Sequence, residues 1–74
     1  MAYDIVPTDG DFNKLLDSIY SNSRIVNWLK QKGYGILEET TSNIMKKTGA
    51  TGAHLHIGPD SSAIEMFNKR ISKA

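Results

Sequence analysis

The run Ala-His-Leu-His-Ile-Gly-Pro at positions 53–59 is the most informative stretch of this sequence. Its histidines alternate with aliphatic residues, and successive side chains of a β-strand point to opposite faces. We therefore expect a strand here, with Leu55 and Ile57 in the core and His54 and His56 together on the other face. The glycine and proline that follow end the strand, because proline cannot donate a hydrogen bond to a sheet.

Outward from this strand, the sequence predicts a second strand at residues 34–38 and a short helix between the two. Thr41 or a neighbouring hydroxyl residue can cap that helix, and Gly49 stops it. Downstream, Ser62 and Glu65 have the spacing of a capping box at the start of a last helix. The face of this helix expected to be buried consists of Ala63, Ile64, Phe67 and Ile71.

The first half of the chain predicts a strand followed by two helices. Residues 3–6 form a short β-prone run closed by Pro7. A first helix has apolar residues at helical spacing. A second helix, with Ser23 as its N-cap, carries Ile25, Val26 and Leu29 on one side and ends at Gly33. The apolar face of the first helix consists of Phe12, Leu15, Leu16, Ile19 and Tyr20.

The resulting order is β-α-α-β-α-β-α over residues 1–74, which we expect to form one small domain. The expected fold class is α+β, with a small antiparallel sheet of about three strands packed by three to four helices. A chain this short buries only about 60% of its unfolded surface, so it needs a metal, a partner or an unusually good core.

Composition excludes several classes of protein. No cysteine is present, so disulfides and thiolate metal sites are excluded. Nine basic and eight acidic residues give a net charge of +1, which provides no electrostatic footprint for nucleic acid. No run approaches the roughly 20 apolar residues of a membrane span, and no signal peptide is evident. We expect a soluble protein, cytoplasmic or phage-associated, with neither nucleic acid nor membrane as partner.

His54 and His56 are the first candidates for a functional site. Zinc prefers neutral imidazole nitrogens together with a carboxylate and an open position for water. Asp4, in the first expected strand, is the carboxylate we expect beside them. By itself the His-x-His pattern is unspecific, and two surface histidines without a ligand are the alternative interpretation.

The flanking residues resemble two related groups of zinc peptidases. Thr-Gly-Ala-His-Leu-His-Ile at positions 51–57 resembles the Thr-Gly-Pro-His-Leu-His-Phe signature of lysostaphin-type zinc endopeptidases. Ala-Tyr-Asp at positions 2–4 resembles the end of the His-x-x-Gly-x-Ala-x-Asp motif of D-alanyl-D-alanine metallocarboxypeptidases. The resemblance extends over residues 2–60, and its His-x-His half is the more specific.

The resemblance implies that Asp4 and His56 are zinc ligands and that His54 polarises the substrate carbonyl or stabilises the oxyanion. The implied substrate is a peptide bond of the peptidoglycan stem or cross-bridge, attacked by water that the metal activates. Two departures matter. The first histidine ligand of the family would precede Met1, and the catalytic glutamate of the carboxypeptidase branch falls at Ala53. We therefore expect a truncated domain that binds zinc weakly and is not active alone.

Three interpretations remain open at this point. The missing ligand can come from elsewhere in a longer protein or from a second chain, and Glu38 or Glu39 can replace the missing glutamate. Alternatively, the chain is a non-catalytic phage-type protein that binds a host protein through the decayed site or the sheet edge at residues 3–6. An exposed edge invites strand pairing, so a homodimer through it is also expected. Finally, His54 and His56 of two chains can share one ion.

Overall fold

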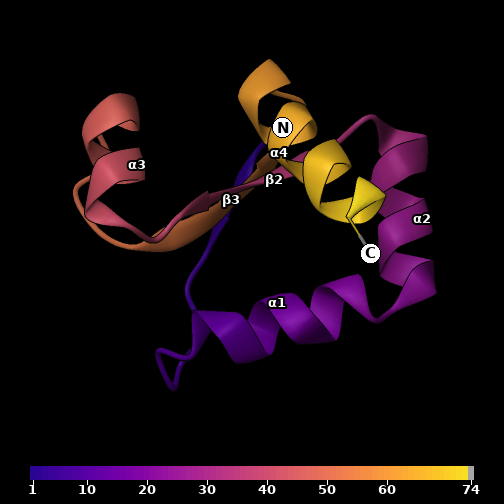
Figure 1. Ribbon diagram of the computed structural model, residues 1–74, viewed down its shortest axis with the longest axis horizontal. Coiled ribbons are helices and arrows are strands. Elements are labelled where there is room, and N and C mark those ends of the chain that lie inside the picture. Colours follow the sequence, from indigo (N-terminus) through magenta and orange to yellow (C-terminus); the bar gives the residue numbers. More distant parts are fainter. Residues whose placement is uncertain (74) are drawn as a thin grey trace.

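The computed structural model describes residues 1–73 and confirms the expected order of elements (Figure 1). The chain folds into a three-stranded antiparallel sheet with four helices over this range, which confirms the α+β class. The elements are β1 (Tyr3–Ile5), α1 (Phe12–Tyr20), α2 (Ser23–Lys32), β2 (Gly35–Glu39), α3 (Ser42–Thr48), β3 (His54–Gly58) and α4 (Ser61–Ser72).

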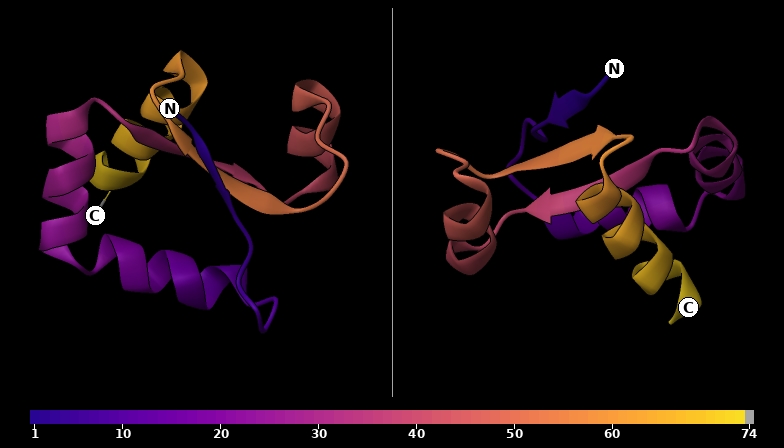
Figure 2. Two further views of the ribbon diagram at one scale, coloured as in Figure 1. Left: turned by 180° about the vertical axis from the view of Figure 1, so that it is seen from behind. Right: turned by 90° about the horizontal axis from the view of Figure 1, so that it is seen from above.

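The strand that contains both histidines, β3, is the centre of the sheet. The strand order is β1-β3-β2, and β3 runs antiparallel to both neighbours, as the right-hand view of Figure 2 shows. In the register, Asp4 lies opposite His56, while Glu39 lies opposite His54. Directly opposite residues of an antiparallel pair point to the same face, so these four side chains share one side of the sheet.

The other face of the sheet carries the core. Leu55 is fully buried and Ile57 nearly so, which confirms the expected alternation along this strand. Strand β2 and helices α1, α2 and α4 contribute the remaining core residues, and Figure 1 shows α1 below the sheet and α2 at one end of the molecule. The buried cluster consists of Leu16, Ile19, Leu29, Ile36, Leu55, Ile57 and Phe67.

The helix ends show why each helix begins where it does. Asp11, Asn22 and Thr41 accept hydrogen bonds from backbone amides of α1, α2 and α3. The N-cap of α2 is therefore Asn22, one residue before the expected Ser23. The capping box expected at Ser62 is wrong, because α4 begins at Ser61 and its N-cap is Asp60, two residues before Ser62. The Asp60 side chain makes no bond to this helix and instead contacts the imidazole of His56.

The two outer strands differ in what lies beside them. Helix α4 covers the free edge of β2, where the backbone N–H of Glu38 donates to Sδ of Met66 at 3.3 Å. The other edge strand, β1, pairs only with β3 among residues 1–73, and Tyr3 is about half exposed. The expected exposed sheet edge at residues 3–6 is therefore present in the described chain. No helix within this range combines the length and apolar character needed to cross a membrane.

Replacing Gly35 by alanine should destabilise the protein through the contact between β2 and α4. A Cβ at this position would overlap the backbone of Ala63 and Ile64. Such overpacking typically costs about 1–3 kcal/mol, and each kcal/mol lowers Tm by roughly 4–8 °C in a domain of this size. Thermal unfolding followed by circular dichroism measures the change. Gly52→Ala is the matched control, because a Cβ there meets nothing within 4 Å; equal Tm values for the two variants would contradict this packing.

Candidate functional site

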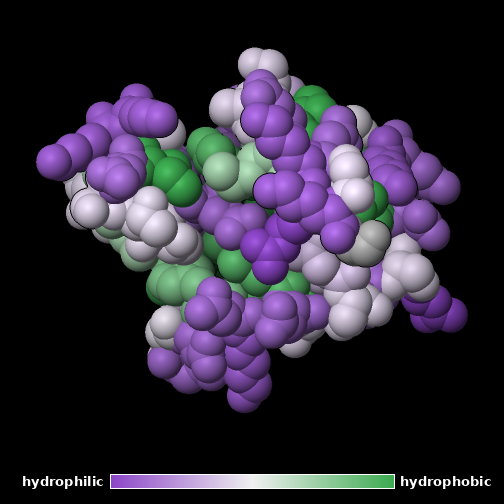
Figure 3. Space-filling view, viewed as in Figure 1, coloured by the Kyte–Doolittle hydropathy of each residue, from purple (hydrophilic) through white to green (hydrophobic). Residues whose placement is uncertain are grey.

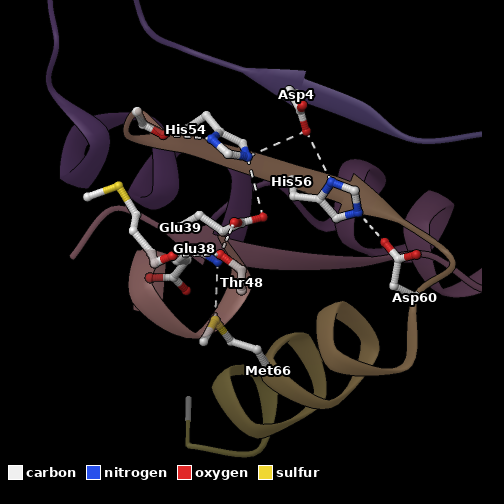
Figure 4. A network of polar contacts seen from close by, with 10 residues as sticks. Asp4, Glu38, Glu39, Thr48, His54, His56, Asp60 and Met66 are labelled. Atoms are coloured by element: carbon white, nitrogen blue, oxygen red, sulfur yellow. Dashed lines mark hydrogen bonds and ion pairs between the residues drawn. The ribbon is translucent and has the colours of Figure 1, made fainter. Parts of the chain in front are cut away.

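The outer face of β3 presents both histidines to the same site, as Figure 4 shows. Because Leu55 and Ile57 point into the core, the side chains of His54 and His56 project from the opposite face and are mostly buried there. Asp4 reaches over from β1, with Oδ1 3.0 Å from Nδ1 of His56 and 3.6 Å from Nε2 of His54. The structure thus brings together all three residues that the sequence indicates.

Glu39 joins this site from the opposite side, on β2. Its Oε1 atom lies 3.3 Å from Nε2 of His54, and its side chain is only 9% exposed. Thr48, at the end of α3, donates a hydrogen bond to the other carboxylate oxygen, Oε2. Glu38 points to the opposite face, where Nη1 of Arg70 lies 3.1 Å from both of its oxygens. Of the two glutamates considered from the sequence, Glu39 alone reaches the histidines.

The backbone fixes the tautomer of His54. Its Nδ1 atom lies 2.9 Å from the carbonyl oxygen of Gly52, and a carbonyl can only accept, so Nδ1 carries a proton and donates it. Nε2 then faces carboxylate oxygens of Glu39 and Asp4. A lone pair directed at two acceptors is unfavourable, whereas a proton or a metal ion on Nε2 makes the same arrangement favourable.

His56 is enclosed by carboxylates on both ring nitrogens. Nδ1 contacts Asp4, and Nε2 contacts Asp60. The hydrogen bond to Asp60 raises the pKa of His56, burial opposes this, and the hydrogen bond to Asp4 with the charges of both carboxylates adds to the rise. Asp60 was not identified from the sequence. The available signal was an aspartate directly after the Gly-Pro turn that ends β3.

The raised pKa of His56 leads to a pH-dependent prediction. In an NMR titration, the ring protons of His56 should show a midpoint above the ordinary value of 6.5. Asp60→Asn should lower this midpoint more than Asp4→Asn, because the Asp60 hydrogen bond is the largest cause. A histidine pKa raised by folding adds stability below 6.5, and this is lost as the pH rises through the folded-state pKa. The urea-unfolded chain is the control; equal midpoints in both states would contradict the carboxylate enclosure.

The donor atoms on this face match zinc ligands in type but not in arrangement. Tetrahedral zinc with bonds of about 2.0–2.2 Å places neighbouring donor atoms about 3.3 Å apart, and the contacts here measure 3.0, 3.3 and 3.6 Å. However, the four side chains form a line from His56 through Asp4 and His54 to Glu39, and their donor atoms do not point toward one common position. Within residues 1–73, no group of three or more His, Cys, Asp or Glu side chains is arranged to hold a metal ion. Binding therefore requires a side chain to move, and Asp4, with 65% of its side chain exposed, is free to do so.

A groove of about 620 Å³ adjoins this face between α3, β2 and α4. Leu37, in its wall, lies opposite His56 in the sheet register, and Thr48, also in its wall, bonds to Glu39. Figure 3 shows hydrophobic atoms between α3, at the upper left, and α4. The full lining consists of Leu37, Ile44, Lys47, Thr48, Ser62, Glu65, Met66 and Lys69. The groove thus shares Leu37 and Thr48 with the surroundings of the site, but neither histidine lines it.

Comparison with known proteins does not assign a family to this chain. No protein-family model, no curated protein and no solved structure matches it. The resemblance to zinc peptidases rests on the two short motifs alone.

Proposed function

We propose that this protein is a zinc-peptidase-like domain that binds zinc on the face formed by Asp4, His54 and His56. One observation carries the proposal. Asp4 and His56 are 52 positions apart in the chain, yet antiparallel pairing of β1 with β3 places their donor atoms 3.0 Å from one another. These are the two residues that the motifs designate as ligands.

The residues of this face have different roles in the proposed reaction. When bound, zinc would supply a Lewis acid that polarises a carbonyl and activates water. Asp4 and His56 would hold the ion. His54, whose orientation the Gly52 carbonyl fixes, faces the same space and can donate a proton from Nε2 to a developing oxyanion. The proposed substrate is a peptide of the peptidoglycan stem or cross-bridge.

Zinc titration of the purified chain tests this proposal. The wild type should bind one zinc ion per chain, measured by calorimetry and elemental analysis. His56→Ala should bind at least about 100-fold more weakly, since losing a ligand exceeds the roughly 10–100-fold effect of losing a supporting partner. Absence of bound metal in the wild type at micromolar zinc would remove the proposal, as would equal affinity in the folded variant. Hydrolysis of peptidoglycan peptides is assayed once binding is established.

A second candidate function is a non-catalytic protein that binds a host protein or a second copy through the edge of β1. The observation that favours it is the edge itself, since β1 pairs on one side only within the described chain and Val6 is 60% exposed. Unpaired backbone groups on an edge strand are a template for another strand. Sedimentation of the metal-free chain over a range of concentrations tests the homodimer. A dimer independent of zinc supports this candidate, and a monomer throughout excludes self-pairing.

A further inference from the structure

We propose that the outer face of α2 is a docking surface for a short acidic segment of another protein. Arg24, Ile25, Trp28 and Lys32 define this face. Arg24, Trp28 and Lys32 follow one another at intervals of four and Ile25 lies three positions before Trp28, so helical geometry places them on one side. All four are exposed. The surface is separate from the histidines, since Figure 1 shows α2 at the opposite end of the molecule from α3.

The charge of α2 is the first argument. The helix contains Arg24, Lys30 and Lys32 and no acidic residue. The other residues of the chain carry six basic against eight acidic groups, a net charge of −2. Within residues 1–73 none of the three cations of α2 forms an ion pair, whereas α1 and α4 each place a cation beside a carboxylate. This unmatched positive charge is complementary to an acidic partner.

The apolar surface that α2 leaves uncovered is the second argument. The large hydrophobic residues exposed within the described chain form two groups, one near β1 and one on α2. The group on α2 consists of Ile25, 39% exposed, and Trp28, 47% exposed. Adjacent apolar side chains rimmed by charges are typical of interaction sites. Tryptophan and arginine, which lie together here, are over-represented among the residues that contribute most to protein–protein binding. The composition of this face therefore favours a protein as partner.

Trp28 is held in position before any partner binds. The ring of Tyr34 packs edge-on against it, with ring centres 5.9 Å apart and planes at 88°. On its other contact, Nζ of Lys32 lies over the indole, 5.9 Å from its centre. A side chain that is already fixed loses little conformational freedom on binding. Lys32 is thus placed to pair with a carboxylate while Trp28 and Ile25 contact an apolar group of the same segment.

A lipid surface and a nucleic acid fit this face less well. A helix that lies in a membrane interface buries a continuous apolar face, but Arg24 and Lys32 flank Trp28 along its row on α2. A nucleic acid presents a long run of phosphates, and the net charge of −2 on the remainder of the chain opposes such a polyanion. A short acidic segment meets only the basic helix.

Titration of the full chain with a model acidic polymer tests the proposal. The probe is a random copolymer of glutamate and leucine. Trp28 reports on binding directly because it is the only tryptophan of the sequence. We expect its fluorescence emission to shift to shorter wavelength and to saturate, as the indole leaves water. Polylysine of the same length should leave the emission unchanged. No shift with the copolymer, or the same shift with polylysine, would overturn the proposal.

Two double variants locate the binding surface. Arg24→Gln with Lys32→Gln should weaken binding of the copolymer roughly 2–30-fold, since each exposed ion pair contributes modestly. Lys46→Gln with Lys47→Gln removes the same charge from exposed positions of α3 and should bind as the wild type does. Exposed substitutions of this kind leave the fold intact. Equal affinities of the two double variants would show that the copolymer responds only to net charge, and the docking surface would be rejected.

The apolar half of the proposal has its own variant. Trp28→Ala should weaken binding at least roughly 30-fold, as truncation of a central tryptophan does in protein interfaces. Calorimetry measures this affinity, because the variant lacks the fluorescent reporter. Unchanged affinity of folded Trp28→Ala would contradict a contact at the indole.

Three further measurements decide the class of partner. Phosphatidylserine vesicles and a single-stranded oligonucleotide are titrated at the same salt concentration, and both should bind more weakly than the copolymer. Tighter binding of either would replace the acidic protein segment and overturn the proposal. Sedimentation of the chain alone tests a second copy as partner. Self-association that is lost in Arg24→Gln with Lys32→Gln would assign this face to a homo-oligomer and overturn the proposal as well.

Discussion

Zinc at about one hundred times its dissociation constant is expected to raise the Tm of this protein by roughly 10–20 °C. A ligand that binds only the folded state at this excess stabilises it by about 2.7 kcal/mol. In a domain of this size each kcal/mol corresponds to roughly 4–8 °C. The site can produce this coupling because its residues come from β1 and β3, which lie together only in the folded chain.

The matched measurement uses His56→Ala under the same conditions. This variant should lack most of the zinc-dependent rise, because it removes the ligand that the sheet register places against Asp4. Differential scanning calorimetry with and without zinc gives both values, and magnesium at equal concentration is the metal control, since Mg²⁺ favours oxygen ligands and resists losing its waters. An equal zinc-dependent rise in the wild type and His56→Ala would show that the ion binds elsewhere.

The sequence predicts the face of histidines more fully than it predicts the carboxylates around it. Strand periodicity is local, so the common face of His54 and His56 follows from five residues. The contact of Glu39 with His54 depends on β2 lying next to β3, and no local pattern contains the order of strands. Asp60 was overlooked because a capping box at Ser62 accounted for the start of α4 without it.

Helix α2 is a second case in which the sequence pattern alone does not predict the burial. Periodicity places Ile25, Val26 and Leu29 on one buried side, yet Leu29 alone is in the buried class and Ile25 is 39% exposed. Figure 1 shows α2 at one end of the molecule, where it does not lie flat against the sheet. A helix at an end buries a narrower stripe than its amphipathic pattern suggests, and only the tertiary arrangement reveals this.

Replacing Phe67 by alanine should remove most of the stability of the metal-free protein and bring it close to its unfolding midpoint. Phe67 is 1% exposed and lies in the core between α4 and the sheet. Truncation of a buried phenylalanine costs about 3–5 kcal/mol, against a total stability of roughly 5–15 kcal/mol that is expected at its low end for so short a chain. Urea denaturation measures the loss as a lower midpoint. Phe12→Ala is the matched control, because Phe12 is only partly buried against the same core.

Zinc should partly reverse the effect of Phe67→Ala. Such a rescue would show that the stability of the core and the binding of metal at the site are coupled. The gain of about 2.7 kcal/mol at high zinc is close to the lower bound of the cost, so the variant should refold largely as metal is added. Leu55, which packs in the core with Phe67, lies between the two histidines of β3, so folding of the core and assembly of the site are one transition. Adding His56→Ala to Phe67→Ala should abolish the rescue. A urea midpoint of Phe67→Ala equal to that of the wild type, or zinc rescue that persists in the double variant, would contradict this coupling.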